Sequence, residues 1–300
     1  MFKTAGGLIS ILLLFQASAL AQQRVLTDDL GFRFISESPP QRIVSLAPNI
    51  TEILFFLGLE SQTVGVTRFC DFPPEAIEKE KIGGLVDPQL EKILALKPDL
   101  IIAFRGNPLR LVQRMRGLDL PVFVLEMGMT VENVFDIIEE IGEVTWTEKK
   151  ASRLTVSLQT RYHSILASLE HIQFFPKVFL SLHGMGLWTC GQGTFLDDLL
   201  HKAKGTNIAG ETKREWILFN REELIYKNPD CIIILSKSQK EFLKAKDDFM
   251  QNPFFNSIKA VNKKNIYFLD ENLVTRLGPR IFEALDQLAH LIHPDLDLNR

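Results

Sequence analysis

The sequence predicts an α/β protein with two lobes, each a central, mostly parallel sheet flanked by helices, and one long rigid α-helix joining them. Three observations lead to this prediction. Strand-like and helix-like segments alternate along the chain, which is typical of parallel sheets covered by helices. A pattern of glutamate, apolar pair, Pro-Asp and apolar strand occurs twice, 131 residues apart, starting at Glu91 and at Glu222. A stretch without glycine or proline, residues 147–172, separates the two copies.

The first 21 residues read as an export signal. Lys3 precedes an apolar run from Leu8 to Phe15, and Ala19-Leu20-Ala21 follows with small residues at a cleavage spacing. The run is shorter than the ~20 residues that span a bilayer. We therefore expect a signal peptide over residues 1–21, cleavage after Ala21 and a mature protein in the periplasm. An uncleaved N-terminal anchor is the alternative. A lipid anchor is disfavoured because no cysteine stands near the cleavage point.

Residues 22–146 are predicted to form the N-terminal lobe. Asn49 and Glu52 have the spacing of a capping box, which predicts a helix start directly after the first strand. Short runs rich in β-branched residues predict the strands, and apolar residues at helical spacing predict the helices between them. The expected strands are 42–46, 63–67, 100–104 and 122–125, and the expected helices are 51–57, 88–96, 109–117 and 131–144.

Residues 147–172 are predicted to form the interlobe helix, with Thr145 and Glu148 capping its start. Apolar side chains recur at every third or fourth position from Leu154 to Leu169, which gives one apolar stripe. At 1.5 Å per residue such a helix would be roughly 39 Å long. This length is unusual for a crossover inside one lobe and suits a strut between two.

Residues 173–300 are predicted to form the C-terminal lobe, with strands at 177–182, 231–235 and 266–269 and helices at 195–204 and 279–292. The repeated pattern supports a lobe of similar design. In each copy the glutamate falls in the first turn of a helix, where the helix dipole favours a carboxylate. Proline then stops the helix, and the strand begins.

Composition excludes several functions. The chain has 300 residues, a formal net charge of −3, 46% hydrophobic and 24% charged residues. Basic and acidic residues are interleaved, so no basic patch for nucleic acid is expected. Three cysteines, Cys70, Cys190 and Cys231, do not make a disulfide framework, and at least one stays unpaired. Their spacing leaves open whether Cys190 and Cys231 form a disulfide.

Taken together, these segments resemble the substrate-binding proteins of ABC importers, of the class whose two lobes are joined by one long helix. The resemblance covers essentially the whole mature chain and is greatest to the members that bind cobalamin. Those members have Trp where this chain has Phe104. The segments that carry it are Arg-Ile-Val-Ser-Leu-Ala-Pro-Asn at 42–49, Thr-Glu at 51–52, and residues 64–67, 71–75, 90–93, 95–107 and 279–281.

The resemblance implies a binding protein without enzymatic activity or a cofactor of its own. Its ligand would be cobalamin or a related cobalt corrinoid, with a ferric siderophore or haem as the alternatives. The ligand would lie between the lobes, which should close only slightly, and pass to an ABC permease dimer in the inner membrane. In the family, one acidic residue on each lobe pairs with permease arginines, and the matching positions here are Glu91 and Glu222. Their alternative role is that of ordinary helix-start carboxylates, worth ~0.3–1 kcal/mol.

A large amphipathic ligand would be held by aromatic contacts and a few polar groups. The candidates lie in loops at the carboxyl ends of predicted strands, where open α/β sheets bind ligands. For each phenylalanine, core packing is the competing interpretation. The candidates on the N-terminal lobe are Pro48, Asn49, Phe69, Asp71, Phe72, Gly84, Phe104, Arg105 and Asn107. Those on the C-terminal lobe are Met185, Trp188, Trp216, Phe219 and Asn272.

No metal site of the protein itself is predicted, although His183 or Cys70 could ligate the metal of a bound chelate. An extracytoplasmic hydrolase is the alternative from another class of function. It draws on His183-Gly184-Met185-Gly186, which resembles an oxyanion loop, but the chain has no G-x-S-x-G nucleophile motif.

Overall fold

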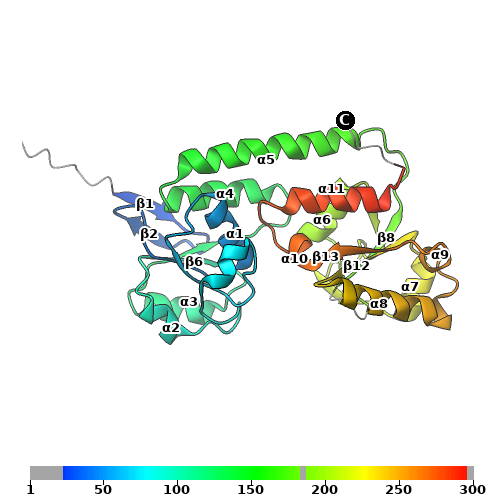
Figure 1. Ribbon diagram of the computed structural model, residues 1–300, viewed down its shortest axis with the longest axis horizontal. Helices are drawn as coiled ribbons and strands as arrows, with labels where there is room; N and C mark the ends of the chain where they lie inside the picture. Colours follow the sequence, from blue (N-terminus) through cyan, green and yellow to red (C-terminus); the bar gives the residue numbers. More distant parts are fainter. Residues whose placement is uncertain (1–22, 183–186, 296–300) are drawn as a thin grey trace, which may run out of the picture.

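The computed structural model describes residues 23–182 and 187–295. Two α/β lobes lie side by side, and the long helix α5 (Glu148–Ser168) runs along one side of both (Figure 1). The predicted export signal at residues 1–21 lies outside the described residues, as do His183 and Met185. In the part of the chain that the structure describes, no helix has the length and apolar character needed to cross a membrane.

The N-terminal lobe contains a five-stranded parallel sheet in the order β5-β4-β3-β6-β7, preceded by an antiparallel hairpin. Its strands are β1 (Arg24–Thr27), β2 (Arg33–Ser36), β3 (Ile43–Ser45), β4 (Thr63–Val66), β5 (Glu80–Lys81), β6 (Leu100–Phe104) and β7 (Val122–Leu125). Its helices are α1 (Pro48–Phe56), the 3₁₀ turn η1 (Pro74–Glu78), α2 (Leu90–Ala95), α3 (Leu109–Arg116) and α4 (Asn133–Val144). The hairpin and β5 were not predicted.

The C-terminal lobe contains a four-stranded parallel sheet in the order β10-β8-β12-β13 and a separate antiparallel pair, β9 and β11. Its strands are β8 (Lys177–Ser181), β9 (Trp188–Cys190), β10 (Thr206–Asn207), β11 (Trp216–Leu218), β12 (Cys231–Ser236) and β13 (Ile266–Asp270). Its helices are α6 (Phe195–Lys202), α7 (Arg221–Lys227), α8 (Gln239–Gln251), η2 (Pro253–Phe255), α9 (Lys259–Asn262), α10 (Glu271–Val274) and α11 (Ile281–Ile292).

The sequence repeat corresponds to a structural repeat. The residue before each Pro-Asp pair adopts a left-handed conformation, with φ of 46° at Lys97 and 49° at Asn228. Each aspartate then accepts backbone N–H groups at the start of the neighbouring strand. Asp99 accepts from Arg42 at 2.8 Å, and Asp230 accepts from Lys177 at 2.9 Å. The Pro-Asp pair therefore ends a helix and holds two adjacent strands in register in both lobes.

Both predicted capping boxes are wrong. Helix α1 begins at Pro48, which needs no N–H at that position, and its N-cap Ala47 has no side-chain cap. The N-cap of α5 is Thr147, because the Thr145 hydroxyl donates to Ile141 O at 2.6 Å instead. Helix α5 also ends at Ser168, four residues before the predicted end. The Leu169 N–H is shared between Ile165 O and Leu166 O, which tightens the last turn.

One hydrophobic core continues from the N-terminal lobe through α4, α5 and α11 into the C-terminal lobe. At its centre Phe135, Tyr162 and Phe282 form a cluster that we call the aromatic junction. The Phe135 and Phe282 rings stack with centroids 5.2 Å apart, and the Tyr162 ring lies 5.1 Å from Phe282. Because the three residues come from α4, α5 and α11, this packing fixes the two lobes to the long helix.

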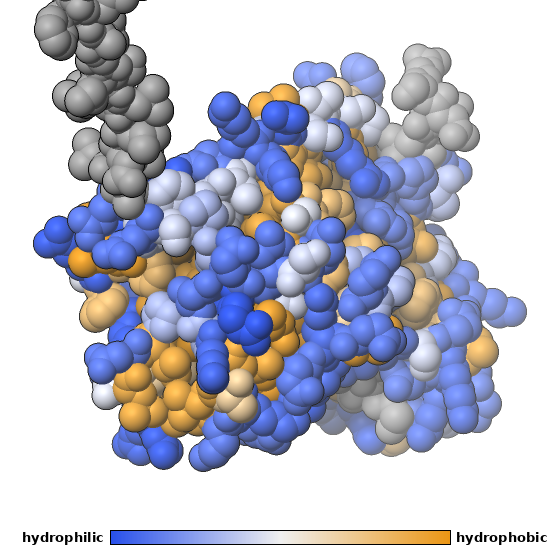
Figure 2. Space-filling view, turned by 60° about the vertical axis from the view of Figure 1, so that its left-hand side comes forward, coloured by the Kyte–Doolittle hydropathy of each residue, from blue (hydrophilic) through white to orange (hydrophobic). Residues whose placement is uncertain are grey.

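The outer surface is mostly polar with scattered apolar patches. Figure 2 turns the N-terminal lobe forward and shows such patches among charged side chains. Exposed apolar residues on this lobe include Val86 and Leu109, at 72% and 53% exposure. Scattered apolar residues are normal on folded proteins, so these positions alone do not mark a binding site.

Candidate functional site

Segments that follow the carboxyl ends of strands in the two sheets contact each other between the lobes, and Asn49 and Asn272 lie there in the helices α1 and α10 and not in the expected loops. Asn49, just after β3, donates from its side chain to Leu277 O at 3.1 Å. Asn272, just after β13, donates to the Asp71 carboxylate at 2.9 Å. Since open α/β sheets bind ligands at these strand ends, the candidate site lies between the lobes.

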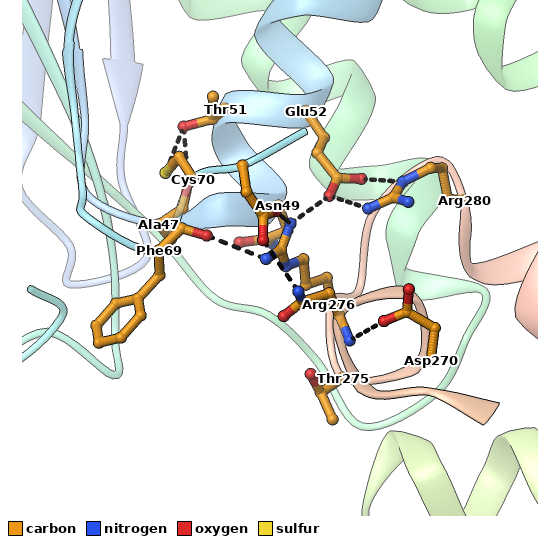
Figure 3. Close-up of polar contacts among 12 residues, drawn as sticks. Ala47, Asn49, Thr51, Glu52, Phe69, Cys70, Asp270, Thr275, Arg276 and Arg280 are labelled. Atoms are coloured by element: carbon orange, nitrogen blue, oxygen red, sulfur yellow. Dashed lines mark hydrogen bonds and ion pairs between the residues drawn. The ribbon is translucent and has the colours of Figure 1, made fainter. Parts of the chain in front are cut away.

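A charged cluster joins the two lobes here, and we call it the ionic junction; it is made of Glu52, Asp71, Arg276 and Arg280. Figure 3 shows Glu52 with Arg276 and Arg280. Glu52 on α1 accepts from Arg276 at 3.1 Å and from Arg280 at 2.9 and 2.6 Å. Arg276 also contacts Asp71 at 2.6 Å and donates to Phe69 O at 3.0 Å. Both arginines come from the C-terminal lobe and both carboxylates from the N-terminal lobe, so the cluster bridges the lobes.

Burial differs sharply within the ionic junction. The Glu52 side chain is 1% exposed and that of Arg276 is 8% exposed, whereas the Asp71 side chain is 48% exposed. Burial by itself disfavours the charged guanidinium of Arg276. Hydrogen bonds and charge attraction from Asp71 and Glu52 outweigh burial and raise its pKa. The sequence pattern did not single out Glu52, Arg276 or Arg280 as site residues. Glu52 and Arg280 lie in segments that carry the family resemblance, but the resemblance did not identify either of them as a site residue.

Phe69 and Phe72 lie beside this junction. The Phe69 side chain is 38% exposed. The Phe72 ring lies 3.7 Å from the Arg280 guanidinium, a cation–π contact. Phe72 also lines a surface cavity of about 470 Å³ with Phe55 and Phe56. The structure therefore brings Asn272 of the C-terminal lobe to the segment of the N-terminal lobe that holds Phe69, Asp71 and Phe72, and a ligand-binding role for these residues stays a prediction.

On the C-terminal lobe, β9 and β11 present an apolar face. Trp188 pairs with Leu218, and Trp216 pairs with Cys190 across the two strands. The side chains of Trp188, Trp216 and Leu218 are 44%, 48% and 62% exposed. Leu182, the residue after β8, donates its N–H to Trp188 O at 2.9 Å, so this face adjoins the carboxyl end of the sheet. Leu218 was missed because a lone leucine carries no sequence signal for binding.

Phe219 does not belong to this face. Side chains alternate along a strand, so Trp216 and Leu218 point outward while Phe219, just past the end of β11, turns into the core. It is 3% exposed, and its ring lies 5.8 Å from that of Phe179. We therefore remove Phe219 from the candidate lining.

Asn107 does not line the candidate site either, because its side-chain amide makes hydrogen bonds inside the N-terminal lobe. It donates to Leu46 O at 3.2 Å and Leu85 O at 2.9 Å, and it accepts from Phe104 N at 3.0 Å. These bonds join the loops that follow β3, β5 and β6, and Asn107 is 4% exposed. Its role is to satisfy buried backbone groups.

The other N-terminal candidates differ in accessibility. Phe104 and Pro48 are half-buried, and Arg105 is exposed and paired with Glu126 at 2.7 Å. Asn49 is 5% exposed and serves the interlobe contact described above. Gly84 is buried, and a Cβ there would lie 2.3 Å from Asp87 Oδ1. Gly84 therefore permits a close loop approach and offers no side chain to a ligand.

All three cysteines are free and buried, so the structure contains no Cys190–Cys231 disulfide. Burial raises the pKa of the Cys70 thiol, although hydrogen bonds from Thr51 and Thr67 oppose the shift. Burial raises the pKa of Cys190 and of Cys231 to about 12. Cys70 is thus a hydrogen-bonded thiol of the N-terminal lobe, poorly suited to ligate a metal as a thiolate. Among residues 23–182 and 187–295, no group of three or more His, Cys, Asp and Glu could hold a metal ion.

Glu91 and Glu222 lie in the first turns of the equivalent helices α2 and α7, and both side chains are exposed. No ion pair of either carboxylate is found among the described residues. Their position leaves both available to a partner.

Comparisons with known proteins agree with this architecture. The family model described as periplasmic binding protein matches residues 43–273. An uncharacterized ABC transporter substrate-binding lipoprotein, YvrC of Bacillus subtilis, is 30% identical over 278 residues, covering 90% of this chain and 86% of that protein. A vitamin B12-binding protein of Pectobacterium carotovorum is 28% identical over 252 residues, covering 83% and 87%.

The same fold occurs in a solved structure, the periplasmic heme-binding protein RhuT from Roseiflexus in apo form. It superposes with a TM-score of 0.78 at 24% identity, covering 86% of this chain and 99% of that chain. The chain therefore belongs to the periplasmic binding protein family, and it is a substrate-binding protein of ABC transport rather than an enzyme.

Proposed function

We propose that this protein captures cobalamin or a related corrinoid between its lobes and delivers it to an ABC importer. The observation that carries the proposal is the exposed apolar face of Trp188, Trp216 and Leu218, which adjoins the carboxyl end of the C-terminal sheet. A flat, amphipathic macrocycle gains most from rigid aromatic surface with a few polar groups at its rim. The likeness to vitamin B12-binding proteins supports this ligand class.

Titration of the chain from Gln22 onward with cyanocobalamin tests the ligand. We expect saturable quenching of tryptophan fluorescence, and we expect Trp216→Ala to weaken binding at least about tenfold, as for a central aromatic contact. Tyr226→Ala is the matched control, because Tyr226 is 85% exposed on α7, outside the apolar face. Absence of any heat or spectral change with the wild-type protein would refute the corrinoid assignment.

Ferric siderophores and haem are the alternatives within the same class. Competition between cyanocobalamin, haemin and a ferric siderophore, followed by absorbance, identifies the preferred ligand. Displacement of cyanocobalamin by a stoichiometric amount of haemin would show that haem, and not a corrinoid, is the preferred ligand.

Delivery is assigned to Glu91 and Glu222, the equivalent exposed carboxylates of the two lobes. Reversing both charges, Glu91→Lys with Glu222→Lys, should impair uptake into cells while leaving the affinity for cyanocobalamin unchanged. Glu80→Lys is the control. Glu80 is exposed on the N-terminal lobe, as Glu91 is, but its carboxylate pairs with Lys92 at 3.1 Å. Weaker ligand binding in the double variant would contradict a docking role.

Export to the periplasm is part of the proposal and rests on the leader at residues 1–21. N-terminal sequencing of the protein recovered from the periplasm should read from Gln22. A chain that still starts at Met1 and stays with the membrane would instead indicate an anchor.

A further inference from the structure

Two hydrogen-bond donors of the C-terminal lobe converge on one carboxylate of the N-terminal lobe. Arg276 Nη1 lies 2.6 Å from Asp71 Oδ1, and Asn272 Nδ2 lies 2.9 Å from Asp71 Oδ2. Each donor thus contacts a different oxygen of the Asp71 carboxylate. A charged guanidinium and an amide arranged in this way recognise the anionic oxygens of a carboxylate or a phosphate.

Among the charged residues of the ionic junction, Asp71 can move away from its partners at the lowest cost in free energy. Its side chain is 48% exposed, so its carboxylate can return to water when its partners are lost. Arg276 stays in place without it, because Glu52 and Phe69 O also hold the guanidinium, at 3.1 and 3.0 Å. Glu52 cannot leave in the same way, because its side chain is 1% exposed and an unpaired buried charge is costly.

The position of the two donors relates them to the ligand. Asn272 lies at the carboxyl end of β13, and Asp71 lies in the loop after β4. Asn272 belongs to the short helix α10, and its side chain meets that of Asp71 between the lobes, where Arg276 also donates to Phe69 O at 3.0 Å. An anionic group on the rim of a ligand held there would meet Arg276 and Asn272 if Asp71 moved aside.

We propose that Arg276 and Asn272 form an anion-recognition site, that the Asp71 carboxylate holds this site in the structure, and that an anionic oxygen of the ligand replaces it. The inference rests on the proposed function in placing the ligand between the lobes. It extends that function by stating that the transported chelate carries a phosphate or carboxylate group on its rim. Asp71 then acts as an internal competitor, which lowers the affinity for an anionic ligand by the cost of its own displacement.

Pairs of probes that differ in this group test the proposal. Cyanocobalamin carries a phosphate diester and dicyanocobinamide lacks it; haemin carries two carboxylates and its dimethyl ester has none free. Asp71→Ala should raise the affinity for cyanocobalamin or haemin about tenfold, the scale of one charge-assisted hydrogen bond. The same change should leave the affinity for dicyanocobinamide or the ester within about twofold.

Two further variants keep the test specific. Asn272→Ala should reduce the preference for the anionic member of each pair, because one of the two donors is gone. Glu211→Ala is the matched control, because Glu211 is an exposed carboxylate that pairs with Lys227 at 2.6 Å away from the interlobe loops. Thermal unfolding of each variant shows whether the fold is kept. An equal change for both members of a pair, or weaker binding of the anionic member by Asp71→Ala, would overturn the proposal.

Inorganic phosphate separates this inference from the identity of the ligand. If no tetrapyrrole binds the wild-type protein, the corrinoid function fails. The anion site is then tested by the effect of phosphate on the melting temperature, against an equal ionic strength of chloride. A larger phosphate-induced rise in Asp71→Ala than in the wild type supports the site, whereas equal shifts overturn it.

Discussion

The two lobes meet at two places of opposite chemistry. The aromatic junction under α5 is part of a continuous hydrophobic core, and Phe282 there is fully buried. The ionic junction is built from two arginines of one lobe and two carboxylates of the other. Packed rings have one favourable arrangement, because interiors are close-packed. Charged groups can exchange one oxygen partner for another, provided that each stays paired.

This difference assigns separate tasks to the two junctions. The aromatic junction fixes the lobes to the long helix, and Glu132 on its edge accepts hydrogen bonds from Tyr162 and Lys202. Burial opposes ionisation of Glu132, but the bonds from Lys202 and Tyr162 outweigh it and lower its pKa. The ionic junction joins the same two lobes through charged groups, of which the Asp71 side chain is 48% exposed.

The largest effect is expected from removing a ring of the aromatic junction. Phe282→Ala should lower the free energy of unfolding by about 3–5 kcal/mol, because a fully buried phenylalanine leaves a cavity. Urea unfolding followed by circular dichroism measures the loss. Phe254→Ala is the control, since Phe254 is 65% exposed and should change stability by about 0.5 kcal/mol or less. A loss below about 1 kcal/mol in Phe282→Ala would mean that the junction does not support the lobes.

A somewhat smaller effect is expected at the ionic junction. Glu52→Gln leaves Arg276 and Arg280 facing a neutral group, and breaking a buried ion pair costs about 3 kcal/mol. The same unfolding measurement applies, with Glu80→Gln as the control for an exposed pair worth ~1 kcal/mol or less. Combining Glu52→Gln with Arg280→Met should recover part of the loss, because the two residues are in contact. Purely additive losses would argue against a coupled junction.

The smallest effect concerns pH and a carboxylate on α4, the helix that supplies Phe135 to the aromatic junction. Burial, with repulsion from Asp29, Asp136 and Glu143, raises the pKa of Glu140 to about 7. The folded protein therefore binds this proton more tightly than the unfolded chain, and its contribution to stability is lost as pH rises from about 4.5 to 7.

Glu140→Gln should accordingly stabilise the protein by about 1 kcal/mol at pH 8 and have little effect at pH 4, since the group is half-exposed and partly screened. Thermal unfolding at the two pH values measures the difference. A benefit of the same size at both pH values would show that the change acts through packing and not through charge.

Much of the fold could be predicted from the sequence because its signals are local. The strands Leu100–Phe104 and Val122–Leu125 were predicted with the bounds that the structure has. The capping predictions failed, because Asn49 bonds the other lobe and the Thr145 hydroxyl bonds Ile141 O in place of a helix end. Short elements such as β9 and β11 were missed, since three residues carry too little pattern to be recognised.

The sequence by itself determined the alternation of strands and helices, the repeat around Glu91 and Glu222, and the long helix between them. These features depend on residue spacing of 2 or 3.6 and on proline, which act along the chain. Only the tertiary structure decided that Phe219 is core and Leu218 is surface, and that Glu52 on α1 meets Arg276 and Arg280 more than 200 positions later. A buried charge takes its partner from whatever the fold places beside it, and that partner leaves no trace in local sequence spacing.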